Sequence, residues 1–169
     1  MAKSDTQIIK SFDLKDELSS EIWFLDGDTY KMKPEIRQAL LDVVENYVDF
    51  TDLELDIEDI TLTGSLSNYN WSDFSDVDLH IIMDFPGGPK SLLKKYLDSK
   101  RIIWNSLRDV TIKDFDVEVY AQDSNEPHFA SGVYSVLYDE WIVEPTRGED
   151  IEIDTQKLLS KAKGWMEKI

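Results

Sequence analysis

The sequence has no cysteine, no long apolar run and few basic residues, and each shortage excludes a class of protein. Without cysteine the chain forms no disulfide and no thiolate zinc site, which removes any argument for secretion. No stretch approaches the roughly 18 consecutive apolar residues of a membrane span. The first residues, Met-Ala-Lys-Ser-Asp, lack the apolar core of a signal peptide. These shortages predict a cytoplasmic protein with no membrane partner.

Positive charge is scarce, because 18 Lys and Arg stand against 35 Asp and Glu, for a net charge of −17. Nucleic-acid binding rests on Lys and Arg contacts to phosphates, so this chain is repelled by a polyanion unless a local basic patch intervenes. Two basic clusters have the pattern of solvated helix faces. They are Lys90, Lys94, Lys95, Lys100 and Arg101, and Lys157, Lys161, Lys163 and Lys168. Nucleic acid is therefore disfavoured as a partner but stays open.

Apolar residues make up 41% of the 169 residues, which suffices for one domain with an adequate core. Their spacing indicates helices and strands in alternation. The predicted elements are helices over 34–49, 90–107 and 155–168, strands over 59–63, about 76–84 and 115–121, and a β-hairpin of 132–137 with 140–143 around Tyr138-Asp139. We expect an α+β fold, a mixed β-sheet with helices packed against it, in a single domain over 1–169 with its core at about 34–145.

Four shorter segments have weaker patterns. Residues 19–24 are expected to form a short docking turn, and Asp26-Gly27-Asp28 a second turn. Alternating apolar residues over 53–57 suggest a short strand inside an acidic connector. Residues 109–113 fit either a short strand or a loop.

The chemically informative residues are concentrated in the segment Leu62–Asp84, LTGSLSNYNWSDFSDVDLHIIMD. Asp76 and Asp78 lie two positions apart in an apolar run, so in a strand they share one face and Val77 points to the other. Two partly buried carboxylates side by side repel each other, and a hard cation such as Mg²⁺ or Mn²⁺ removes that cost. The pair therefore predicts a metal site.

Gly64 and Ser65 come directly after the strand over 59–63 and are expected to open a short helix at about 65–70. Glycine lets the backbone approach a ligand closely, and a helix N-terminus offers free N–H groups to a phosphate. A phosphate-binding turn beside metal-binding carboxylates is the arrangement used in phosphoryl and nucleotidyl transfer.

An apolar strand, Gly-Ser, ten further residues and then Asp-apolar-Asp-apolar resembles the signature of the DNA polymerase beta-like nucleotidyltransferase superfamily. The chain looks especially like the small stand-alone, or minimal, nucleotidyltransferase domains of bacteria and phages. The motif covers Leu62–Leu79, and a weaker resemblance extends from about Pro34 to about Pro145. The resemblance implies a polymerase beta palm-like fold and a nucleoside triphosphate substrate, expected to be ATP. It also implies phosphate binding by Gly64 and Ser65, and two divalent metals on Asp76, Asp78 and a third carboxylate from a later strand.

The third carboxylate is expected in the strand over 115–121, where Asp116, Glu118 and Tyr120 share one face. Glu118 is the favoured residue because it lies in mid-strand between two valines. It would act as a metal ligand and as a general base for the attacking hydroxyl. Asp116, closer to the start of the strand, stays open as the alternative.

Other polar residues near the motif have a functional and a structural interpretation. His80 shares the face of Asp76 and Asp78, although a hydrogen-bonded structural histidine is favoured, and Asp84 is expected in a loop. The further candidates are Lys94 or Arg101 for the triphosphate, and His128, Ser131 and Tyr134 for the nucleotide or acceptor, with packing as the equal alternative for the last three.

The sequence thus predicts a metal-dependent nucleotidyltransferase that moves a nucleoside monophosphate from an NTP to a hydroxyl and releases pyrophosphate. Little chain lies beyond the core to recognise tRNA or DNA, so the expected acceptor is a small molecule or a partner protein, as in minimal nucleotidyltransferases that pair with a toxin. Two alternatives stay open. One is a non-catalytic nucleotide- or partner-binding module on the same fold, and the other is an RNA-end-modifying nucleotidyltransferase, which the net charge disfavours.

Overall fold

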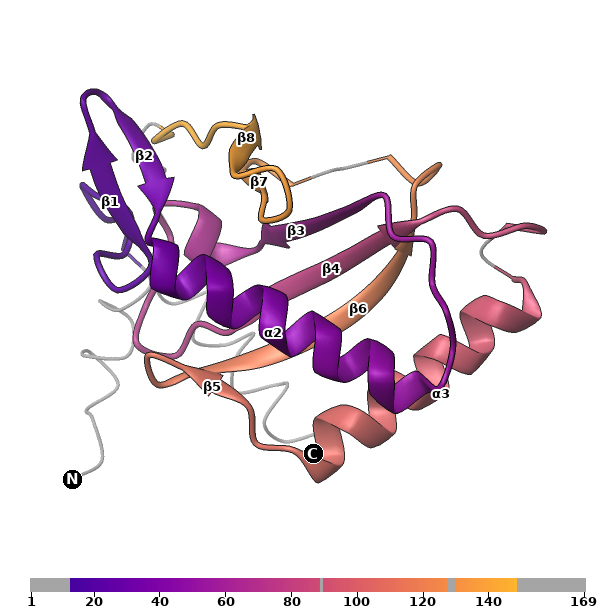
Figure 1. Cartoon of the computed structure of the whole chain (residues 1–169). Coiled ribbons are helices and arrows are strands. Elements are labelled where there is room, and N and C mark those ends of the chain that lie inside the picture. The colour runs from indigo at the N-terminus through magenta and orange to yellow at the C-terminus, as the bar shows by residue number, and fades with distance from the viewer. Residues whose placement is uncertain (1–12, 89, 128–129, 149–169) are drawn as a thin grey trace, which may run out of the picture.

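The structure is a computed structural model that describes residues 13–88, 90–127 and 130–148 (Figure 1). Within these residues a six-stranded sheet, a two-stranded hairpin and two long helices form. His128 and the helix predicted over 155–168 lie outside the described residues. The elements are β1 (Trp23–Asp26), β2 (Thr29–Met32), α2 (Pro34–Thr51), β3 (Asp59–Thr63), the 3₁₀ turn η1 (Ser65–Ser67), β4 (Val77–Met83), α3 (Leu92–Leu107), β5 (Thr111–Ile112), β6 (Phe115–Asp123), β7 (Val133–Ser135) and β8 (Glu140–Val143).

The large sheet has the strand order β5-β6-β4-β3-β7-β8. Its central pair, β4 and β6, is parallel, and every other neighbouring pair is antiparallel. Parallel neighbours need a long crossover connection, and α3 lies in the chain between β4 and β6. The predicted α+β class with a mixed sheet is confirmed.

The sheet has one apolar face and one polar face because side chains alternate along each strand. Val77, Leu79 and Ile81 of β4 are buried, together with the matching residues of β6. Figure 1 shows α2 lying across this part of the sheet, with α3 along β6 on the side away from β4. The helices are joined where the Tyr47 hydroxyl donates to the Leu97 carbonyl oxygen at 3.0 Å. The opposite face is left for the polar residues.

The long helices and the main strands follow the sequence prediction closely. Helix α2 begins at Pro34, which fits the first helical position because proline has no N–H to leave unpaired. Helix α3 begins after Ser91, whose hydroxyl accepts a hydrogen bond from the Lys94 N–H at 3.2 Å. The segment predicted as either a strand or a loop contains the short strand β5. The predicted hairpin is present as β7 and β8.

Two predictions about short elements are wrong, and a third segment is more regular than expected. The strand expected over 53–57 is absent, because none of the described strands pairs with this segment. The helix expected over 65–70 is only the turn η1, because Asn68 adopts an extended backbone and its side chain binds the Gly64 carbonyl instead. Residues 20–22 and Gly27-Asp28 form turns, as predicted, and the residues on either side of the second turn also pair as the hairpin β1–β2.

In the part of the chain that the structure describes, no helix combines the length and apolar character needed to cross a bilayer.

Candidate metal centre

The register of three adjacent strands brings distant parts of the chain to one point. Thr63, the last residue of β3, pairs with Asp78 of β4. Asp78 in turn pairs with Glu118 of β6. The Gly-Ser turn that follows β3 and the candidate third carboxylate therefore flank Asp78 on its two sides.

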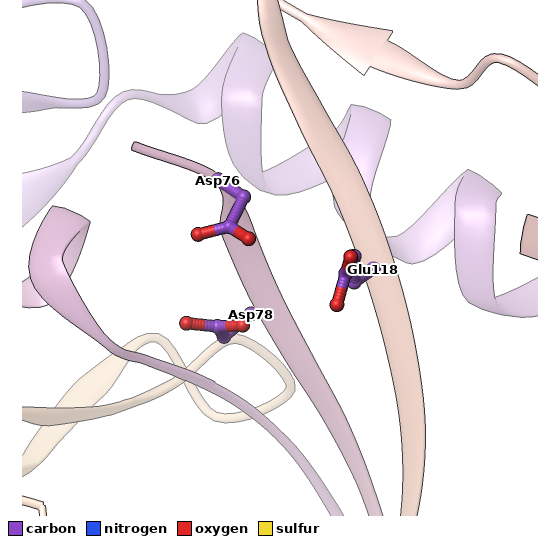
Figure 2. A group of neighbouring side chains, drawn as sticks. All are labelled: Asp76, Asp78 and Glu118. Carbon is purple, nitrogen blue, oxygen red and sulfur yellow. The ribbon is translucent and has the colours of Figure 1, made fainter. Parts of the chain in front are cut away.

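Three carboxylates gather at this point, as Figure 2 shows. Asp76 immediately precedes β4, Asp78 lies on β4 and Glu118 lies on β6. Each offers an oxygen, and these oxygens all lie within 4.8 Å of one another. All three residues are half-buried. Asp116 is exposed and pairs with Thr111 on β5, so of the two acids considered for the third position the structure brings Glu118 to the cluster.

The three negative charges have no close positive partner within the described residues, where none of the ion pairs involves them. Burial, with the neighbouring Asp76 and Glu118 carboxylates adding to it, raises the pKa of Asp78 to about 6. Three converging carboxylates at this separation match the oxygen-only ligand sets of hard divalent cations. The residues present therefore fit a Mg²⁺ or Mn²⁺ centre.

Gly64 lies directly against the Asp78 carboxylate. Its backbone has φ 78° and ψ −162°, a conformation that residues with side chains rarely adopt. A Cβ atom there would lie 2.1 Å from Oδ2 of Asp78. The glycine is thus required by the carboxylate of this chain as well as by any ligand that approaches the turn.

Three hydrogen bonds hold the turn that follows Gly64. The Trp23 indole donates to the Leu66 carbonyl at 2.7 Å, and the Asn68 amide donates to the Gly64 carbonyl at 2.9 Å. The Ser65 hydroxyl donates to the Ser75 hydroxyl oxygen at 2.7 Å. Because Ser75 immediately precedes Asp76, this last bond ties the candidate phosphate-binding turn to the first carboxylate.

Two residues singled out in the sequence for other roles flank the carboxylates. His80 lies on the face of Asp78, as predicted, and stacks on the Tyr120 ring with centroids 5.1 Å apart. The Arg101 guanidinium lies 4.9 Å from the centroid of the same ring. Lys94, the alternative to Arg101 for the triphosphate, is paired with Asp98 at 2.6 Å. Of these two basic residues, Arg101 is thus the one that contacts a side chain bonded to the carboxylate cluster.

The remaining candidates have mainly structural surroundings. Tyr134 is 1% exposed and packs against two tryptophans, so its interpretation as a nucleotide or acceptor contact is wrong. The Ser131 hydroxyl donates to the Asn68 side-chain oxygen at 2.9 Å, which connects it to the Gly64 turn. Asp84 lies in a loop, as predicted, where it accepts a hydrogen bond from Asn125.

Sequence reasoning gave no role to Tyr120, although it placed this residue on the face of Glu118. The Tyr120 hydroxyl donates a hydrogen bond to Oε2 of Glu118. Burial raises the pKa of Tyr120, and the bond to Glu118 raises it further. The available signal was the spacing of an acid and a tyrosine two positions apart in a strand. Ser75 and Trp23, which also support the site, carry no comparable sequence signal.

Comparison of the chain with protein-family models, curated proteins and solved structures found no match.

Proposed function

We propose that this chain is a metal-dependent nucleotidyltransferase that uses an NTP, with ATP as the expected donor. The observation that carries the proposal is the cluster of Asp76, Asp78 and Glu118 oxygens within 4.8 Å of one another, beside the Gly64 turn. Three carboxylates that form no ion pair with the described residues fit divalent metals, and a glycine turn next to them fits the phosphates that such metals accompany.

The reaction we propose is attack of an acceptor hydroxyl on the α-phosphorus of the NTP. A bond forms between the acceptor oxygen and phosphorus, the bond from phosphorus to the oxygen bridging the β-phosphate breaks, and pyrophosphate leaves. Asp76, Asp78 and Glu118 would hold the metals, which supply neutralisation of phosphate charge and a lowered pKa for the acceptor hydroxyl. Glu118 is the proposed acceptor of the hydroxyl proton.

The residues around the carboxylates would hold the triphosphate. The backbone at Gly64 leaves room for close approach, and the Ser65 hydroxyl, already fixed by Ser75, would contact phosphate oxygens. Arg101 projects over Tyr120 next to the cluster and would bind the phosphates that depart as pyrophosphate.

The proposed acceptor is a protein or a small molecule. A net charge of −17 disfavours a nucleic-acid acceptor, because polyanions are repelled without a dedicated basic surface. The strongest competing function is a non-catalytic nucleotide- or partner-binding module, which has no need for three converging carboxylates.

Incubation with NTP labelled at the α- or the γ-phosphate, Mg²⁺ or Mn²⁺, and cell lysate tests the proposal. We expect α-label on an acceptor and γ-label in pyrophosphate. Asp78→Asn and Glu118→Gln should lower the rate by about 100-fold or more, since each removes metal-held charge stabilisation worth several kcal/mol.

Asp116→Asn is the matched control, because Asp116 lies on the same strand as Glu118 but is exposed and outside the cluster. It should keep the wild-type rate. Transfer of γ-label to an acceptor would indicate a kinase instead. Nucleotide binding without any transfer, unaffected by Asp78→Asn, would indicate a binding module.

A further inference from the structure

Tyr120 is a polar residue in direct contact with the carboxylate cluster, and the proposed function leaves it unused. It lies two positions after Glu118 on β6, and its hydroxyl donates to Oε2 of Glu118. A carboxylate has about four lone-pair sites, so this bond leaves the rest of the Glu118 carboxylate able to bind a cation.

The ring that carries this hydroxyl is held from two sides. The β4–β6 register pairs His80 with Tyr120, two residues along the strands from the Asp78–Glu118 pair and on the same face. The His80 and Tyr120 rings stack at an angle of 25°. Arg101 approaches the Tyr120 ring from α3, which lies on the other side of β6 (Figure 1). These two contacts restrict the orientation of the Tyr120 ring, so its hydroxyl stays directed at Glu118.

The Glu118 side chain needs a partner to hold its orientation, because the neighbouring negative charges repel its carboxylate. Asp76 and Asp78 repel its carboxylate, and the glutamate side chain has enough rotatable bonds to turn away from them. A hydrogen bond to an ionised carboxylate is stronger than one between neutral groups, so the Tyr120 hydroxyl counteracts that repulsion.

We propose that Tyr120 is a positioning residue: its hydroxyl holds the Glu118 carboxylate toward Asp78, while His80 and Arg101 fix the Tyr120 ring. This inference rests on the metal centre of the proposed function. Hydrogen-bond partners that orient metal-binding side chains typically contribute about 10–100-fold to metal affinity. Tyr120 is such a partner of Glu118.

Binding of Mn²⁺, followed by the loss of the free-ion EPR signal, tests the inference without any enzymatic assay. Tyr120→Phe removes only the hydroxyl, and we expect it to weaken Mn²⁺ binding by about 10-fold or more. Its urea-unfolding midpoint without metal should stay close to that of the wild type. Tyr96→Phe is the matched control, because the Tyr96 hydroxyl donates to a backbone carbonyl, that of Thr51, and should leave Mn²⁺ binding unchanged.

A double-mutant cycle separates positioning from a general effect on the fold. In a Glu118→Gln background, Tyr120→Phe should have little further effect on Mn²⁺ affinity, since the carboxylate that it positions is gone. Equal losses in both backgrounds, or wild-type affinity in Tyr120→Phe, would overturn the inference. Absence of Mn²⁺ binding by the wild type would overturn the metal centre as well. Mn²⁺ binding with the expected Tyr120 effect but without nucleotidyl transfer would overturn only the proposed function.

Discussion

The contact between Gly64 and Asp78 shows how one residue without a side chain shapes the candidate site. The space that a methyl group would need at Gly64 is filled by the Asp78 carboxylate. Asp78 can therefore lie against the backbone turn, level with Glu118 on the neighbouring strand. The absence of a side chain at Gly64 therefore gives the direct contact between carboxylate and backbone turn that the proposed site needs.

Replacement of Gly64 by alanine should damage both stability and metal binding. A positive φ costs a residue with a side chain about 1–2 kcal/mol, and the clash with Asp78 adds to this. We expect Gly64→Ala to lower the free energy of unfolding by about 2 kcal/mol or more. It should also weaken Mn²⁺ binding, because the Asp78 carboxylate must move.

Gly27→Ala is the control for backbone strain alone. Gly27 has a similar φ of 65°, but a Cβ atom there meets nothing within 4 Å. The Gly27→Ala variant should lose about 1 kcal/mol of unfolding free energy and bind Mn²⁺ as the wild type does. Urea unfolding and Mn²⁺ titration of both variants check this, and identical behaviour of the two would show that the Asp78 contact has no effect.

At the scale of elements, the hairpin β1–β2 supports the turn η1 across the molecule. Trp23 of β1 is 2% exposed, stacks on Trp141 with centroids 4.6 Å apart and donates its indole N–H to the Leu66 carbonyl. A segment outside the sheet thus fixes the backbone next to the candidate phosphate-binding residues.

Trp23→Phe should loosen this turn. It removes the indole donor, leaves the buried Leu66 carbonyl without that partner and creates a small cavity, for a loss of about 2–3 kcal/mol in unfolding free energy. Amide hydrogen exchange at Leu66 and Ser67 should rise. Trp71→Phe, which removes an exposed indole bond to the Glu17 carbonyl, should cost less and leave exchange at the turn unchanged. Unchanged exchange in Trp23→Phe would contradict the proposed support.

The sequence predicts those features of the elements that depend on residues close together in the chain, and not those that depend on how distant segments pair. Alternation of apolar residues places Asp78 and Glu118 on polar faces of buried strands, and helical spacing gives α2 and α3 nearly complete. Pairing of Asp78 with Glu118, and of His80 with Tyr120, depends on strand order and register, which tertiary packing decides. The structural role of β1 in holding η1 is equally non-local.

At the scale of the whole molecule, the excess of acidic residues affects the stability of the fold. A net charge of −17 produces repulsion in the compact state, and the candidate metal centre concentrates three of those charges at one point. Added salt should stabilise the protein by screening, and a divalent ion should stabilise it further by binding.

Thermal unfolding in MgCl₂ and in NaCl of matched ionic strength separates these two effects. We expect the melting temperature to rise more in MgCl₂, as binding to the folded state requires. Asp78→Asn should be more stable than the wild type without metal at neutral pH, by about 1 kcal/mol after allowance for partial exposure. It should lose the additional effect of Mg²⁺. Asp116→Asn should keep that effect, and an equal response of all three proteins would show that Mg²⁺ acts only through ionic strength.

The parallel pairing of β4 with β6 has a consequence for the order of folding. The chain must pass through α3 and β5 before β6 can lie beside β4, so this contact closes a long loop and is entropically costly to form early. Asp76 and Asp78 can meet Glu118 only after that closure. A cation bound by all three carboxylates would therefore bind late in folding. It would chiefly slow unfolding and would have little effect on the folding rate.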